Sequence, residues 1–299
     1  MATTLTGAPI PDWTRSVVAV PPPEPGPGHW AGGPSAVGVD GGIVLAYRLR
    51  RPVGHGRGYA VVLARSDDGV AFEEIGRVER DGFGAASLER PALVRRPDGG
   101  WRLYVSCSTP GSLHWWVDAL DAPDPASFDP ARRVTVWPGD AATGVKDPVV
   151  HCREEGRWEA WVCCHPLEVP HEADRMASRH ATSDDGLAWF WGADALTGTP
   201  GGWDQRGARI TSVLAGGAVA VYDGRASAAE NWEERTGIAV AVPEGGFRAV
   251  GEGPAAASPH GGGGLRYLSV VELPGGGRRL YYEATRADGA HEIRTEVVP

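Results

Sequence analysis

A short motif returns along this chain at a fixed interval of 57 residues. Pro34, Pro91 and Pro148 each open a stretch of β-forming residues, followed by a glycine turn and a strand that ends in an aromatic residue. Repeats of about 40 to 60 residues, built from short strands without a helical period, are typical of propellers of four-stranded sheets. Five such units fit the 299 residues. The interval therefore predicts an all-β fold, a five-bladed β-propeller with four-stranded antiparallel blades.

The expected blades follow one another along a single domain that covers residues 1–299. The fourth segment keeps the pattern less faithfully, and the fifth offers only three strands. We expect an N-terminal strand to complete the last blade, because closing the ring removes exposed strand edges that promote aggregation. The expected blade ranges are 33–80, 87–138, 144–195, 207–252, and 258–299 together with 14–20.

Composition argues against several classes of partner. The net charge of −9 opposes a nucleic-acid or anionic-membrane role, since such partners attract cationic surfaces. No segment has the roughly 18 consecutive apolar residues of a membrane span, and residues 1–12 lack the pattern of a secretion signal. From these absences we expect a cytoplasmic protein. The four cysteines fit no metal-binding spacing, so we expect no metal or cofactor. The sequence does not indicate an oligomeric state.

A second repeat marks the turn between the third and fourth strands of two blades. Ser66–Phe72 reads Ser-Asp-Asp-Gly-Val-Ala-Phe, and Ser183–Trp189 repeats it with Leu and Trp. Asp followed by Gly favours a turn capped by a side chain, with a positive φ at the glycine. The motif resembles the Asp-box turn of sialidases and other propellers that act on sugars. We expect it to be structural.

Charged residues gather where the first strands of the expected blades begin. In a propeller these strands line the central channel, so their starts meet at one mouth although they are distant in sequence. Charged side chains are rarely buried without a partner or a function. The residues expected at the mouth are Gly32-Gly33, Glu89-Arg90 and Lys146-Asp147, with Ala208-Arg209 and Arg266-Tyr267 as approximate counterparts.

Lys146 is the only lysine of a chain that contains 28 arginines. A compact ammonium with three rotatable donors differs from a planar guanidinium, so a buried site can require lysine in particular. Two interpretations stay open from the sequence. Lys146 either serves a ligand at the mouth, or it has no such role and is a structural ion pair with Asp147 or a chance survival.

The segment Gly144–Val150, which reads Gly-Val-Lys-Asp-Pro-Val-Val, resembles a motif of the five-bladed glycosidases in glycoside hydrolase families 43, 32 and 68. Those families place three acids at the mouth: an Asp that opens blade one, an Asp-Pro in blade three and a Glu that opens blade four. Asp147-Pro148 matches the second, which stabilises the transition state and tunes the pKa of the acid. The resemblance therefore implies that Asp147 orients a sugar.

Two of the three acids of these families have no match in this chain. Gly33 stands where the blade-one acid belongs, and 207–210 contains no carboxylate at the place of the blade-four acid. Glycoside hydrolysis ordinarily needs two carboxyl groups, so other residues would have to supply them. Second strands end where first strands begin, which makes Asp223 and Glu283 candidates. The catalytic set expected for a hydrolase is Asp147, Glu89 and Asp223.

Basic residues at the same mouth suggest a different reaction. Arginines around one lysine suit a phosphate or a sugar carboxylate, and the arrangement resembles the phosphorylases of glycoside hydrolase family 130. In those enzymes one protein carboxylate is the acid and bound phosphate attacks the sugar. Ion pairing of these arginines with nearby acids is the structural alternative. The expected substrate-binding residues are Arg90, Lys146, His165, Arg209, Arg225, Arg266 and Glu283, with Trp203 and Glu234 on loops of blade four.

The sequence thus predicts a carbohydrate, or a small anionic or hydroxyl-rich ligand, at the central mouth. Cleavage of a glycosidic bond is the first hypothesis. A binding propeller that has lost its catalytic acids and a glycoside phosphorylase are the alternatives. The sugar, the linkage, the stereochemical outcome and the presence of any enzymatic activity stay open at this stage.

Overall fold

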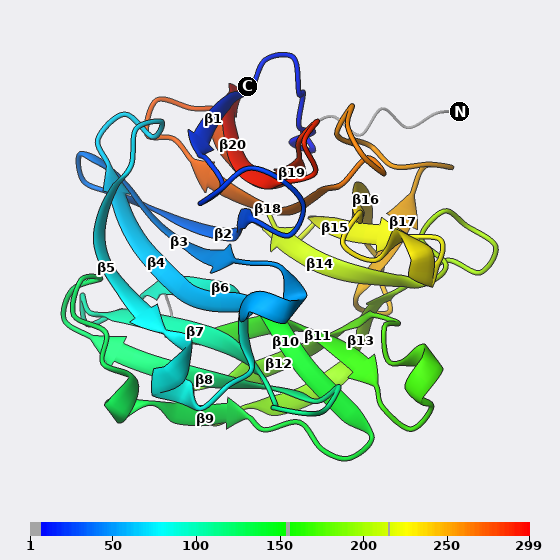
Figure 1. The fold of residues 1–299 in the computed structure, drawn as a ribbon, viewed down its shortest axis with the longest axis horizontal. Helices are drawn as coiled ribbons and strands as arrows, with labels where there is room; N and C mark the ends of the chain where they lie inside the picture. The colour runs from blue at the N-terminus through cyan, green and yellow to red at the C-terminus, as the bar shows by residue number, and fades with distance from the viewer. Residues whose placement is uncertain (1–6, 154–155, 215) are drawn as a thin grey trace.

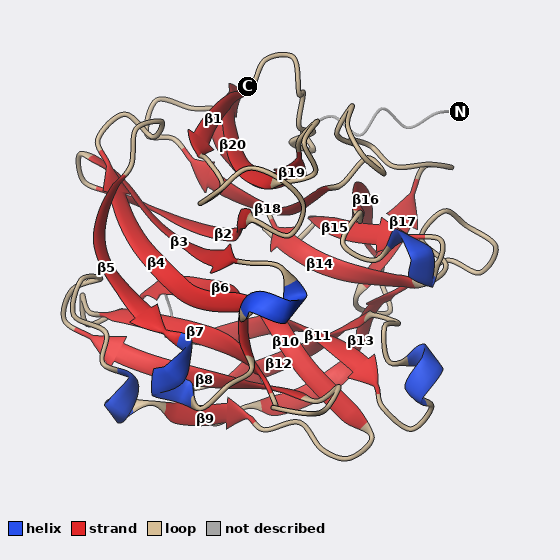
Figure 2. Ribbon diagram, in the orientation of Figure 1, coloured by secondary structure: helices blue, strands red, loops and turns tan. Residues whose placement is uncertain are grey.

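The computed structural model describes residues 7–153, 156–214 and 216–299. Strands dominate these residues, and the helical elements among them are short 3-10 turns (Figure 2). The sheets follow one another around a ring, which brings the strands near the two chain ends side by side (Figure 1). In the described part of the chain, no helix is long and apolar enough to cross a membrane.

Each blade is a four-stranded antiparallel sheet. Blade one consists of β2 (Trp30–Val39), β3 (Gly42–Arg50), β4 (Gly58–Ser66) and β5 (Glu73–Glu79). Blade two consists of β6 (Ser87–Arg95), β7 (Trp101–Ser108), β8 (Trp115–Ala122) and β9 (Val134–Trp137), and blade three of β10 (Thr143–Cys152), β11 (Trp158–Pro166), β12 (Ala177–Ser183) and β13 (Phe190–Thr197). Blade four consists of β14 (Gly207–Val213), β15 (Val219–Arg225), β16 (Arg235–Ala241) and β17 (Phe247–Val250). Blade five consists of β18 (Leu265–Glu272), β19 (Arg278–Thr285), β20 (His291–Val298) and β1 (Val17–Val20). The 3-10 turns are Val53–His55, Arg80–Phe83, Pro130–Arg132, Pro170–Glu172 and Ala228–Glu230.

The N-terminal strand closes the ring. In the pairing of β1 with β20, Val17 lies opposite Thr295, and Arg294 Nη2 donates to the backbone oxygen of Ser16 at 2.8 Å. A single parallel contact between Trp30 and His291 joins blades one and five into one continuous sheet. The predicted all-β propeller, with an N-terminal strand that completes the last blade, is confirmed.

The hydrophobic core consists of five clusters, each between two neighbouring blades. Successive side chains of a strand point to opposite faces of its sheet. In β4, Leu63 therefore packs toward Leu103 of blade two, whereas Val62 packs toward Tyr281 of blade five. Both faces of the blade are buried, so the inner strands tolerate few charges except near the channel ends.

The repeated proline marks a bulge in the innermost strand. Pro34 and Pro148 lie within an interruption of the pairing, and Pro91 follows the same interruption in β6. Proline lacks a backbone N–H and is tolerated where a ladder is interrupted. The bulge turns neighbouring side chains toward opposite ends of the channel. Glu89 and Arg90, for example, line two different cavities.

Side chains hold the two Asp-containing turns. Asp185 Oδ1 accepts hydrogen bonds from the backbone N–H groups of Leu187 and Ala188, both at 2.8 Å. Asp68 Oδ1 makes the equivalent contacts with Val70 and Ala71. These bonds connect the third and fourth strands of their blades, far from the mouth cavity described below, in keeping with the structural role expected for the motif.

Candidate functional site

A cavity of about 300 Å³ opens at the end of the channel where the first strands begin, and we call it the mouth cavity. All five blades contribute to its wall. Residues from the connection between β11 and β12, and from the loop after β15, complete it. The residues that line it are Arg48, Arg50, Arg57, Glu89, Leu113, Trp115, Lys146, His165, Pro170, Ala173, Asp174, Met176, Arg209, Arg225, Asn231, Trp232, Glu234, Arg266 and Tyr267.

Most of the site residues predicted from the sequence meet at this cavity, but some do not. Asp147, Asp223 and Glu283 are fully buried and do not line it. Arg90 lines a different cavity at the opposite end of the channel, and Trp203 packs in the core against Tyr222, with ring centres 5.8 Å apart. The functional roles of all these residues stay predictions. The predicted residues that line the mouth cavity are Glu89, Lys146, His165, Arg209, Arg225, Glu234 and Arg266.

Asp147 and Asp223 share one arginine at the floor of the cavity. Arg209 Nη1 donates to Asp147 Oδ2 at 3.2 Å, and its Nη2 donates to Asp223 Oδ2 at 2.7 Å. The Tyr267 hydroxyl also donates to Asp147 Oδ2, at 3.2 Å. Asp147 and Tyr267 adopt left-handed backbone conformations, with φ of 52° and 57°, which strain a residue other than glycine. Burial raises the pKa of Asp223 to about 6, against the attraction of Arg209.

Glu283 is the centre of a second buried network. Its carboxylate accepts from Arg266 Nη2 at 2.6 Å and from the Gly33 backbone N–H at 2.9 Å, and His291 Nδ1 lies 2.7 Å away. A Cβ atom on Gly32 would lie 1.8 Å from Glu283 Oε2. The glycine pair that stands in place of a blade-one acid therefore leaves room for a carboxylate from blade five.

The carboxylates of Glu89 and Glu234 reach the cavity, and arginines hold both. Glu89 Oε2 accepts from Arg48 Nη1 at 2.5 Å, and Glu234 Oε2 accepts from Arg266 Nη1 at 2.5 Å. Burial opposes the ionisation of both groups, but the attraction of arginines outweighs it and lowers both pKa values well below the usual range of a glutamate. Neither side chain is expected to hold the proton that a general acid must deliver at neutral pH.

These pKa shifts predict that the protein loses stability in acid. Glu89, Glu234 and Glu283 have pKa values lowered from 4.5 in the folded state, so the unfolded chain binds more protons below about pH 4.5. Their contribution to stability is fully present above that pH and is lost as the pH falls through the folded-state values. Urea unfolding between pH 7 and pH 3 checks this expectation. A free energy of unfolding that stays constant from pH 5 to pH 3 would contradict it.

Two cations that line the cavity have no acidic partner in the described part of the chain. The Arg50 guanidinium carbon lies 3.9 Å from the ring centre of Trp30 and 4.7 Å from that of Trp232, and Lys146 Nζ lies 4.6 Å from the ring centre of Trp115. Among the described residues, neither cation has a carboxylate oxygen within 4.0 Å. Burial lowers the pKa of Arg50 to about 9. The ion pair with Asp147, considered from the sequence for Lys146, does not form.

His165 lies in the cavity wall as an uncharged ring, and both of its nitrogens contact protein groups. Its Nδ1 lies 3.0 Å from the Ala173 carbonyl oxygen, and its Nε2 lies 3.4 Å from Cys163 Sγ. Burial and the neighbouring Lys146 lower the pKa of this imidazole well below 6.5, while burial raises the pKa of the Cys163 thiol to about 12. A thiolate nucleophile is therefore not available here. Within the described ranges, no three His, Cys, Asp or Glu side chains are grouped to hold a metal ion.

Some residues that line the cavity are not predicted from the sequence. The rule that second strands end at the mouth, applied to blade one, would have pointed to Arg48 and Arg50 at the end of β3. Trp232, like Trp203, lies on a blade-four loop where the sequence suggests stacking on a sugar, but no sequence signal shows which of the two reaches the cavity.

No protein-family model matches the sequence, and no match was found among curated proteins. Solved structures, in contrast, match the fold over nearly the whole chain. A glycosyl hydrolase from Bacteroides ovatus has a TM-score of 0.64 and 14% identity, and the match covers 96% of this chain and 95% of that chain. β-1,2-Mannobiose phosphorylase from Listeria innocua, in complex with β-1,2-mannobiose, has a TM-score of 0.65 and 13% identity, with 95% and 96% covered.

A third structure, the GH43_1 enzyme from Xanthomonas citri complexed with xylose, has a TM-score of 0.65 and 14% identity, with 94% of this chain and 91% of that chain covered. At such low identity the likeness concerns the fold. The chain therefore has the propeller fold of glycoside hydrolases and phosphorylases, as its sequence motifs predicted.

Proposed function

We propose that the mouth cavity binds an anionic carbohydrate, such as a sugar that carries a carboxylate or a phosphate. One observation supports this above all: Arg50 and Lys146 line the same cavity, and each lacks a carboxylate partner within the described chain. Arg50 is buried and Lys146 is half-buried. Burying a cation without a counterion is costly, and a bound oxyanion would provide charge-assisted hydrogen bonds to both. The rings of Trp115 and Trp232 offer flat surfaces for the apolar face of a sugar.

Hydrolysis by two protein carboxylates receives less support from the same geometry. Asp147 and Asp223 lie behind Arg209 and Tyr267, and the carboxylates of Glu89 and Glu234 are ion-paired. A hydrolase needs one carboxyl group that is protonated and a second that is free to act as base or nucleophile.

Phosphorolysis is a second candidate, and one observation favours it. Lys146 lies close enough to Glu89 for its charge to help lower the pKa of that carboxyl group. A phosphate bound at Lys146 would offset this charge and raise the proton affinity of Glu89, but the ion pair with Arg48 would also have to break before this carboxyl group protonates a leaving oxygen. One protein carboxylate suffices when phosphate is the attacking group.

Isothermal titration with matched pairs of sugars tests the proposed binding. Glucuronate, galacturonate and glucose 6-phosphate, titrated beside glucose and galactose, differ from the neutral sugars chiefly in the anionic group. We expect the charged member of at least one pair to bind at least tenfold more tightly. Equal affinity within every pair would overturn the proposal. Turnover of aryl glycosides, measured with and without inorganic phosphate, separates phosphorolysis from hydrolysis and from binding alone.

A further inference from the structure

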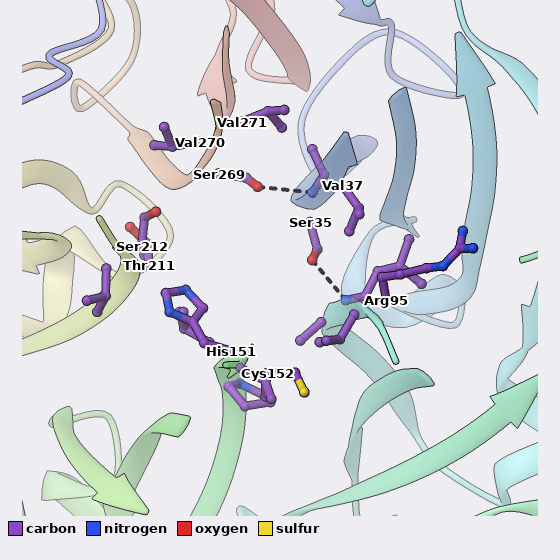
Figure 3. A pocket seen from close by; sticks show the side chains of 18 of the residues that line it. Ser35, Val37, Arg95, His151, Cys152, Thr211, Ser212, Ser269, Val270 and Val271 are labelled. Carbon is purple, nitrogen blue, oxygen red and sulfur yellow. Dashed lines mark hydrogen bonds between the residues drawn. The ribbon is translucent and has the colours of Figure 1, made fainter. Parts of the chain in front are cut away.

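A second cavity, of about 540 Å³, lies at the other end of the channel, and we call it the rear cavity (Figure 3). Its wall is formed by the later parts of the five inner strands β2, β6, β10, β14 and β18. The buried group of Asp147, Arg209 and Tyr267 separates it from the mouth cavity. Arg90 connects to this group from the rear, because its backbone N–H donates to Asp147 Oδ1 at 3.1 Å.

Arg90 lines the rear cavity, and its guanidinium is buried and incompletely bonded. The residue is 3% exposed, and its Nη2 donates to the backbone oxygens of Thr211 at 2.9 Å and Pro34 at 3.4 Å. Its Nε and Nη1 have no hydrogen-bond partner among the described residues. No carboxylate oxygen of these residues lies within 4.0 Å of it. Arg209 and Arg266, the equally buried arginines of the mouth, each bind two carboxylates.

Hydroxyl groups surround the same cavity with their hydrogens available. Ser35 Oγ accepts from the backbone N–H of Leu93 at 2.9 Å, and Ser269 Oγ accepts from that of Ala36 at 3.0 Å, as the dashed lines in Figure 3 indicate. A hydroxyl that accepts from the backbone still has its own hydrogen to donate. Ser212 also lines the cavity. Donors from three inner strands thus accompany the buried Arg90, and the more exposed Arg95 and Arg153 line the same cavity.

We propose that the rear cavity is a second anion site, in which Arg90 and the serine hydroxyls bind a small oxyanion, either a phosphate group or a carboxylate. The guanidinium provides a positive charge without a carboxylate partner among the described residues and two unbonded donors that the protein encloses, and the hydroxyls provide donors from the facing strands. Such a set matches the several acceptor oxygens of an oxyanion. Because the buried group at the middle of the channel lies between the cavities, the rear site takes its ligand independently of the mouth.

Titration of inorganic phosphate and of acetate, at an ionic strength held constant with chloride, tests the rear site. We expect at least one of the two anions to bind in an event that survives Lys146→Met and is weakened at least tenfold by Arg90→Gln. The first variant removes a cation of the mouth, so it separates this site from the one proposed there. Absence of binding by both anions, or an event that Arg90→Gln leaves unchanged, would overturn the proposal.

A second variant keeps the test valid if Arg90→Gln does not fold. Ser212→Asp introduces a carboxylate into the rear cavity as an internal counterion. This variant is expected to abolish the binding event and to raise the melting temperature in the absence of added anion. Undiminished anion affinity in Ser212→Asp would contradict a rear site at Arg90.

Discussion

Arg266→Met is expected to lower the free energy of unfolding by about 3 to 5 kcal/mol, the usual cost of removing one partner of a buried ion pair. Arg266 donates to Glu234 Oε2 at 2.5 Å and to Glu283 Oε1 at 2.6 Å, and all three side chains are almost completely buried. Methionine has a similar volume but offers no charge. Two buried carboxylates would then lose the cation that they share. Urea unfolding at pH 7 measures the loss.

Arg278→Met is the matched control for this variant. Arg278 pairs with Glu272 at 2.9 Å, but the pair is exposed to solvent, and such pairs contribute about 0 to 1 kcal/mol. Adding Glu283→Gln to Arg266→Met should recover part of the lost stability, because it removes one unpaired charge. Equal losses in Arg266→Met and Arg278→Met would contradict a buried charge network at the mouth.

Replacing both unpaired cations, in the variant Arg50→Gln with Lys146→Met, is expected to weaken the binding of an anionic sugar at the mouth by about 100-fold or more. A hydrogen bond to a charged group contributes about 1.5 to 3 kcal/mol, which corresponds to roughly 10- to 150-fold in affinity for each cation. Each single variant should therefore lose about tenfold or more. Isothermal titration with the tightest-binding sugar acid measures both effects.

Arg51→Gln is the control for the loss of a stacked arginine. The Arg51 guanidinium carbon lies 4.0 Å from the ring centre of Tyr59, much as Arg50 lies over Trp30, but Arg51 is exposed and does not line the cavity. Its replacement should leave affinity unchanged within about twofold. If the double variant binds the sugar acid as tightly as wild type does, these two cations do not form the anion site.

The fold could be predicted because a short local motif, which fixes the shape of the inner strand, recurs in several blades. Pro34, Pro91 and Pro148 mark the same bulge in three blades, and a bulge tolerates proline where a regular inner strand does not. The incomplete fifth blade likewise required a strand from elsewhere, which β1 supplies.

The site could be predicted only in part, because the direction of a side chain at a bulge depends on three-dimensional geometry. Glu89 and Arg90 are adjacent in sequence, yet they line cavities at opposite ends of the channel. Trp203 and Trp232 lie on comparable loops after β13 and β15. Trp203 is partly buried and packs against the core, whereas Trp232 stacks on Arg50. Ion pairing decides whether the other predicted acids are available to a ligand. Asp223 and Glu283 reach the channel, but each carboxylate is paired with an arginine.

We infer that the unpaired cations at the mouth of this propeller's channel bind anions. Anomalous diffraction from a crystal soaked in selenate, a heavier analogue of sulfate, tests it most directly. We predict an anomalous peak in the mouth cavity within hydrogen-bonding reach of Lys146 Nζ and the Arg50 guanidinium. Peaks confined to arginines on the outer surface, with none in the mouth cavity, would contradict the claim.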